Sequence, residues 1–222
     1  MSAINWDAIG EHKFETGVDH GVLYVQNTDG SYNNGVAWNG LTAVTSSPDG
    51  AEPTDLWADN IKYATLRSAE TFGATIEAYT YPDEFAECDG SVEVADGVYI
   101  GQQSRKAFGF VYRTKVGSDS DTDASGYKLH IIYNATASPS ERAYETINDS
   151  PDAITFSWEI TTTPVTVTGY KPTSEITIDV GALAEGKKDI LENKLFGDTN
   201  AEATLPSPDA LLALIGATTT TT

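Results

Sequence analysis

The sequence predicts a mainly β fold: a β-sandwich or barrel of antiparallel strands with one short flanking helix. Two stretches rich in Phe, Val, Tyr and Ile, residues 107–116 and 126–137, flank the polar segment GSDSDTDAS, a pattern typical of a β-hairpin. A third stretch, AITFSWEIT at 153–161, alternates apolar and polar residues, as a strand with one buried face does. The 222 residues suit one large all-β domain or two small ones, and we place a single β-domain at 21–180.

The chain is expected to enter this domain through an arm. Residues 1–20 show no clear period and predict an N-terminal arm that becomes ordered by lying on another surface. Residues 21–27 predict a short strand, and residues 35–47 predict a longer strand in which Gly40 marks a bend or a bulge.

Segments 55–68 and 70–80 each contain alternating residues, and only a Ser-Ala step separates them. We therefore expect them to pair with each other as a second antiparallel hairpin. Residues 81–90 predict the flanking helix, because Pro82 suits its first turn and Gly90 can end it. Residues 174–180 add a further strand to the sheet.

The alternation also predicts which side chains form the core. Along 153–161 the apolar positions share one face, and the same holds for the segment at 70–80. The expected core residues are Phe72, Ile76, Ile154, Phe156, Trp158 and Ile160.

After Val180 the pattern changes, and residues 181–222 predict a C-terminal docking arm with short helices. Its last helix carries a compact apolar cluster formed by Leu211, Leu212, Leu214 and Ile215. Two interpretations are equally open: the cluster docks on another subunit, or the helix covers its own sandwich.

The charge balance argues against nucleic-acid binding. The chain has 33 acidic and 13 basic residues, a net charge of −20, whereas binding to phosphates requires Lys and Arg. Solubility at high protein concentration is an equally good reason for such a charge. The single cysteine, Cys88, excludes an intramolecular disulfide, and no apolar run approaches a membrane span. We expect a protein that is made and folded in a cytoplasm.

No motif predicts catalysis, a cofactor or a metal site. The series Asp119, Asp121 and Asp123 resembles the start of a calcium loop. The positions that should hold Gly and Glu are Ala124 and His130, which favours a solvated hairpin tip. Acidic neighbours oppose a thiolate at Cys88, and the common hydrolase, nucleotide-binding and zinc motifs are absent.

The residue order from about Leu56 to Val167 resembles the major tail protein, or tail tube protein, of long-tailed bacteriophages. The segments DEFAECDG, FGFVYRT and PDAITFSWE carry most of this resemblance, and the closing LPSPDALLALIG is similar to that family as well. The resemblance implies a β-sandwich that assembles into six-membered rings, and the rings stack into a tube that conducts DNA without binding it specifically. It also implies a fold similar to that of the type VI secretion tube protein.

Under this resemblance the partners are other copies of the chain, together with tape-measure, tail-terminator and baseplate or distal tail proteins. The protein is made in the host bacterial cytoplasm and ends in the virion tail, and the apolar C-terminal cluster docks between rings. No cofactor, catalytic residue or membrane is implied.

A channel that passes DNA should present small polar or negative groups, because each Lys or Arg contact holds a phosphate. The hairpin 55–80 is the first candidate for this wall, with Thr75 and Glu77 facing the lumen. The face that carries Glu159 fits nearly as well. Two other functions remain open: a monomeric surface adhesion sandwich that binds a sugar or a protein, and an enzyme with an unrecognised carboxylate pair.

Overall fold

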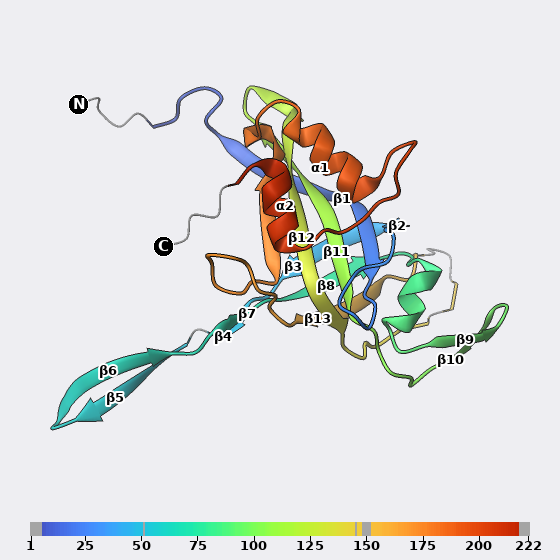
Figure 1. Ribbon diagram of the computed structural model, residues 1–222, viewed down its shortest axis with the longest axis horizontal. Helices are drawn as coiled ribbons and strands as arrows, with labels where there is room; N and C mark the ends of the chain where they lie inside the picture. Colours follow the sequence, from blue (N-terminus) through green and yellow to red (C-terminus); the bar gives the residue numbers. More distant parts are fainter. Residues whose placement is uncertain (1–5, 51, 145, 148–151, 218–222) are drawn as a thin grey trace.

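The computed structural model describes residues 6–50, 52–144, 146–147 and 152–217, with only the backbone at 121–125, and it confirms a mainly β, antiparallel fold (Figure 1). The strands are β1 (Lys13–Val25), β2 (Val36–Trp38), β3 (Leu41–Ser46), β4 (Asp49–Gly50), β5 (Pro53–Ala58), β6 (Ile61–Arg67), β7 (Glu70–Thr71), β8 (Gly73–Ala78), β9 (Val92–Ala95), β10 (Val98–Ile100), β11 (Phe108–Ser118), β12 (Asp121–Ala137), β13 (Phe156–Thr162) and β14 (Glu175–Asp179). The helices are the 3₁₀ turns η1 (Asp83–Glu87) and η2 (Val180–Ala182) and the α-helices α1 (Lys187–Phe196) and α2 (Pro208–Ile215).

One sheet holds eight of these strands. Its order is β2-β1-β11-β12-β13-β8-β3, and β14 pairs with the part of β12 that β13 leaves free. The first and last strands of this order, β2 and β3, follow each other directly in the chain. The sheet therefore curls until its two ends are joined by a single corner, the arrangement by which one strand passes between two packed sheets.

Two glycines make the corner possible. Gly40 lies between β2 and β3 with φ of 77°, a backbone conformation that L side chains rarely adopt. Where β1 crosses the corner, a Cβ on Gly21 would lie 2.5 Å from Leu41 Cδ1 and 2.9 Å from the Trp38 carbonyl oxygen. A side chain at Gly21 would push β1 away from β2 and β3.

An aromatic cluster fills the inside of the curl. Trp38 of β2, Phe85 of η1 and Trp158 of β13 meet there, with ring centroids 4.5 Å (Trp38–Phe85), 5.2 Å (Phe85–Trp158) and 5.4 Å (Trp38–Trp158) apart. Phe108 and Phe110 of β11 complete the contacts of Phe85 and Trp38. Such pairs each contribute roughly 0.5–1.5 kcal/mol beyond the burial of their area.

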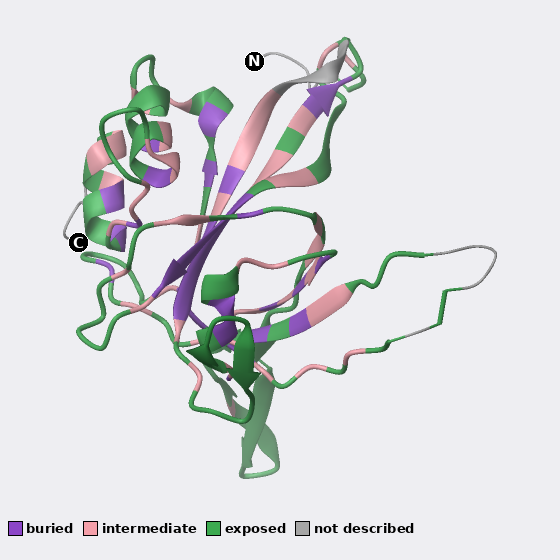
Figure 2. Ribbon diagram, turned by 90° about the vertical axis from the view of Figure 1, so that its right-hand side faces the viewer, coloured by how far each residue is buried: buried purple, intermediate pink, exposed green. Residues whose placement is uncertain are grey.

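A second core lies on the outer face of the same sheet. Helices α1 and α2 cover that face, as Figures 1 and 2 show, and Leu191, Leu195 and Leu211 are fully buried against the strands. The middle strands β11 and β12 are thus buried on both faces, with Phe110 in the first core and Val111 in the second. Burial on both faces explains why these strands read as continuous apolar runs rather than as alternating ones.

Three expectations, two about strands and one about the flanking helix, differ from the structure. Strand β1 starts at Lys13, so residues 13–20, more than half of the strand, lie in the segment expected to be an arm. The strand pairs with β11 from Lys13 opposite Ser118 onward. The polar segment between β11 and β12 is mostly strand, because the turn occupies only the two residues between Ser118 and Asp121. The expected flanking helix is the short 3₁₀ turn η1.

The expected pairing of 55–68 with 70–80 is wrong. Strand β5 pairs with β6, whereas β8 pairs with β3 on one side and β13 on the other. Asp59 and Asn60 both have positive φ values, 53° and 61°, and they form the tight turn that joins β5 to β6. Strand β8 instead lies between β3 and β13, where its apolar side chains Ala74, Ile76 and Ala78 are fully buried.

The residues expected in the core are placed as follows. Ile76, Trp158 and Ile160 are buried in the first core, and Phe72 and Phe156 pack against it half-buried. Ile154 is 38% exposed, because β13 begins only at Phe156 and the alternation before it is not part of a strand.

The C-terminal helices form where the sequence predicts them. Ser207 caps α2, Pro208 is its first residue, and Gly216 ends it with φ of 75°. Leu211 is fully buried in the chain's own second core, and Leu212, Leu214 and Ile215 are half-buried. The helix covers its own sheet, so Leu211 is not available for docking on another ring.

Truncation of Trp158 tests the first core. We expect Trp158→Ala to lower the free energy of unfolding by roughly 3–5 kcal/mol, because a fully buried ring is replaced by a cavity. Urea denaturation followed by far-ultraviolet circular dichroism measures this change. Ile154→Ala is the matched control and should change stability little. Equal effects of the two substitutions would contradict the packing described here.

Removal of residues 198–222 tests the second core. The deletion takes away the buried Leu205 and Leu211, and each lost leucine should cost about 2–5 kcal/mol, enough to destabilise the whole domain. The melting temperature and near-ultraviolet circular dichroism report this loss. Deletion of 218–222 alone, which keeps both leucines, is the control. A stable, natively packed protein after the longer deletion would show that α2 is dispensable for the fold.

Candidate assembly surfaces

The β5–β6 hairpin projects away from the body of the molecule (Figure 1). Among the described strands, β5 and β6 pair only with each other, and almost every residue in them is exposed. They carry five large apolar side chains with 41–73% exposure: Leu56, Trp57, Ile61, Tyr63 and Leu66. A two-stranded ribbon is marginally stable alone in water, and exposed apolar surface of this kind marks a candidate site of contact with another molecule.

The hairpin leaves the sheet through a short clasp. Strand β4 pairs with β7 at the base of the hairpin, with Asp49 opposite Thr71 and Gly50 opposite Glu70. Gly50 has φ of 87°, and a Cβ there would lie 2.6 Å from the Ala69 carbonyl oxygen. The clasp fixes where the hairpin starts, while the curled sheet supports β3 and β8 on either side of it.

A second surface is a polar sheet face on the outside of β3, β8 and β13. The register places Thr75 opposite Glu159 and Glu77 opposite Ser157. The two faces expected to be alternative channel walls are therefore one continuous surface. Glu77 and Thr75 are half-buried, Glu159 is exposed, and the three strands contain no Lys or Arg.

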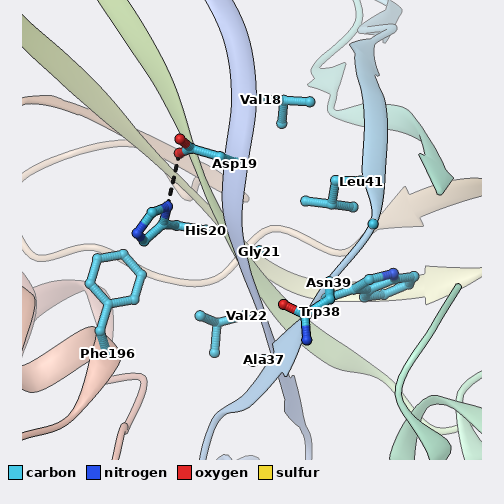
Figure 3. A pocket seen from close by; sticks show the side chains of 11 residues that line it. Val18, Asp19, His20, Gly21, Val22, Ala37, Trp38, Asn39, Leu41 and Phe196 are labelled. Atoms are coloured by element: carbon cyan, nitrogen blue, oxygen red, sulfur yellow. Dashed lines mark ion pairs between the residues drawn. The ribbon is translucent and has the colours of Figure 1, made fainter. Parts of the chain in front are cut away.

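A small cleft lies beside β1 at the corner (Figure 3). It has a volume of about 450 Å³ and lies between β1, the β2–β3 corner and Phe196 of α1. On its wall Asp19 accepts hydrogen bonds of 2.7 and 2.9 Å from the Arg113 guanidinium, and His20 Nδ1 lies 3.1 Å from Asp19 Oδ1. The Arg113 hydrogen bonds hold the pKa of Asp19 below its ordinary value. The ion pair between Asp19 of β1 and Arg113 of β11 joins the two strands. This structural role accounts for both charges in the cleft wall without a bound ligand.

Two of the open strand edges among the described strands lie on opposite sides of the middle strands β11 and β12. Strand β2 pairs only with Gly21–Leu23 of β1, so the outer edge of residues 13–19 is open. Strand β14 pairs with β12 on one side, and no described strand covers its other side. Open edges present unpaired N–H and C=O groups that another strand can bind.

Two further groups that can titrate, Cys88 and His130, lie in the core and in the sheet. Burial raises the pKa of the Cys88 thiol to about 12, which keeps it protonated. His130 stacks on Tyr112 with centroids 4.7 Å apart, and its Nε2 lies 3.0 Å from Thr114 Oγ1. Within the described ranges there is no group of three or more His, Cys, Asp or Glu residues placed to hold a metal ion. No helix in the described part of the chain is long and apolar enough to cross a membrane.

The projecting hairpin is the surface that the sequence interpretation missed. The alternation at 55–68 predicts a strand that pairs with 70–80, and this pattern does not show that the segment projects from the molecule. The signal that could have identified the hairpin is Asp59-Asn60, a two-residue turn between two short apolar runs. Exposure of both faces of the ribbon is not visible in its sequence.

Comparison with known proteins identifies no family. No family model matches the chain, and no curated protein matches it. One similar solved structure is the sheath-tube complex of an extracellular contractile injection system in its extended state, which has 10% sequence identity and a TM-score of 0.31. The similarity covers 78% of this chain and 93% of that chain.

Proposed function

We propose that this chain is a structural subunit that assembles with copies of itself into stacked six-membered rings, forming the tail tube of a long-tailed bacteriophage around a channel for DNA. The observation that carries the proposal is the β5–β6 hairpin, which exposes five large apolar side chains far from the body of the molecule. Burying each such side chain contributes roughly 1.5–3 kcal/mol. Where the protein is concentrated, a second copy of the chain is the partner that can bury these side chains.

The open edges support ring formation. The strands β14, β12, β11 and β1 are neighbours in that order, so the two open edges lie on opposite sides of this part of the sheet. Pairing of residues 13–19 in one copy with β14 in the next continues the sheet from subunit to subunit. A closed ring then covers both of these edges in every copy, which limits uncontrolled pairing.

The polar face supports a channel for DNA. It presents Thr75, Glu77 and Glu159, and its three strands carry no cation. Such a wall repels phosphates, so DNA slides past without being held at each step. The resemblance of the residue order at 56–167 to tail tube proteins agrees with this role. The same resemblance proposes tape-measure, tail-terminator and distal tail proteins as further partners, and the virion tail as the location.

Electron microscopy of the concentrated protein tests the assembly. We expect hollow tubes, and we expect added salt to promote them, because the Debye length falls to about 3 Å near 1 M and the charge of −20 is then screened. A protein that stays monomeric at every concentration and salt level contradicts the proposed function. A monomer that instead binds a sugar or a protein would favour the adhesion alternative.

Removal of the apolar hairpin surface should abolish tubes without unfolding the domain. The variant Trp57→Ser with Tyr63→Ser changes two exposed side chains, so its melting temperature should stay close to that of the native chain. Sedimentation and microscopy measure assembly. Tyr170→Ser, at another exposed aromatic residue, is the control. Normal tubes from the double variant would show that the hairpin is not an assembly element.

Charge reversal on the polar face tests the channel wall. We expect Glu77→Lys combined with Glu159→Lys to permit tube formation but to reduce DNA delivery by an infectious particle, because six copies per ring would hold phosphates. Glu185→Lys, an exposed position before α1, makes the same kind of charge change away from this face. Normal delivery by the double variant would place another surface on the lumen.

A further inference from the structure

We infer that the β5–β6 hairpin of one copy docks on an acidic platform at the other end of a second copy, formed by η1 and the β9–β10 hairpin. This inference rests on the proposed function, since it names the partner surface through which the subunits join. Figure 1 shows the two hairpins at opposite ends of the longest axis of the molecule, and in Figure 2 β9–β10 lies in front while β5–β6 lies far behind.

The platform has the apolar surface that such a contact needs. Strands β9 and β10 pair only with each other, as β5 and β6 do. Their large side chains are 40–56% exposed: Val92, Val94, Val98, Tyr99 and Ile100. Two exposed apolar hairpins on one molecule leave a large area in water until each meets a complementary surface.

The charges of the two surfaces are complementary. A hollow of about 550 Å³ lies between η1 and β9–β10, and its wall carries four carboxylates, from Asp83, Glu84, Glu87 and Glu93. Lys106 is the cation in this wall, and it is paired with Glu87. The β5–β6 hairpin carries two acidic and two basic residues, so it is neutral in a chain of net charge −20. Lys62 is paired with Asp55 of the same hairpin at 2.8 Å, so Arg67 is the basic residue that the platform can attract. The neutral hairpin can approach the platform, whereas most of the surface of another copy would be repelled.

The apolar groove between α1 and α2 is a poorer acceptor. It is lined by Leu205, Pro206, Ala210 and Leu214, but Lys194 also lies in its wall. This groove offers no carboxylate to the basic residues of the hairpin. The platform provides both the apolar surface and the opposite charge.

The contact joins two different patches, so it is heterologous. Such contacts form a closed ring when the rotation between copies closes, and an open helical array when it does not. The two patches lie at opposite ends of the long axis. In an open array, every added subunit therefore leaves one hairpin and one platform free for the next. Docking at this site propagates the assembly in one direction.

Disulfide trapping between separately purified variants tests the contact. Ile61→Cys on the hairpin is mixed with Val98→Cys on the platform, assembled and oxidised, and linked dimers are counted on a non-reducing gel. The native Cys88 is buried and does not compete. Ala213→Cys, an exposed position on α2, replaces Val98→Cys as the matched control for the helix groove. We expect linked dimers with Val98→Cys and none with Ala213→Cys.

The result separates this inference from the proposed function. Tubes that form without the Ile61–Val98 link, or with a link to Ala213, overturn the docking site and leave the tube assembly standing. A chain that forms no tubes overturns both.

Charge reversal at the platform gives an independent measurement. Glu84→Lys should raise the concentration needed for assembly roughly fivefold, because an exposed attraction of about 1 kcal/mol is lost. Glu185→Lys reduces the net negative charge equally and should lower that concentration or leave it unchanged. If Glu84→Lys eases assembly as much as Glu185→Lys does, the platform is not the acceptor.

Discussion

The aromatic cluster inside the curled sheet is the interaction on which the rest of the structure depends. Trp38 comes from one end of the sheet, Trp158 comes from its other half, and Phe85 lies between them with a ring contact to each. Phe85 is fully buried although it belongs to a 3₁₀ turn of only five residues. Without this cluster the two ends of the sheet would have no common core, and the corner at Gly40 would join two separate sheets.

Closure of the sheet determines which surfaces remain for other molecules. One face of β8 and β13 is committed to the aromatic cluster, so their other face, with Glu77 and Glu159, must be polar. The outer face of β11 and β12 is covered by α1 and α2, which removes it and Leu211 from any contact between subunits. Residues 53–67, between β3 and β8, contribute no side chain to either core, and they leave the body as the β5–β6 hairpin. The net charge of −20 opposes contact between two copies, and the β5–β6 hairpin, which is neutral, is an exception.

Much of the fold could be predicted from periodicity, and the errors have physical causes. The alternation around Trp158 locates a buried strand face, and the capping residues Ser207 and Gly216 locate α2. The pairing of residues 70–80 is not predictable from the alternation alone. Two alternating segments that are neighbours in the sequence can pair with each other or with more distant strands, and the pattern is the same in both cases. Strand β8 pairs with β13 and β3 rather than with β6 because its apolar face is buried beside these two strands, which are distant from it in the sequence. The candidate site was predicted in part: Thr75, Glu77 and Glu159 share one face, whereas the exposed hairpin required the fold to be known.

Amide hydrogen exchange measured from dilute to concentrated protein tests the central claim most directly, that the β5–β6 hairpin exists to be covered by a second copy. Its amides are bonded only within a two-stranded ribbon, so in dilute protein they should exchange rapidly, while β11 and β12 are protected at every concentration. The account predicts that residues 53–67 become protected as the protein assembles and that the protected strands of the core do not change. Rapid exchange of residues 53–67 in the assembled protein would contradict it.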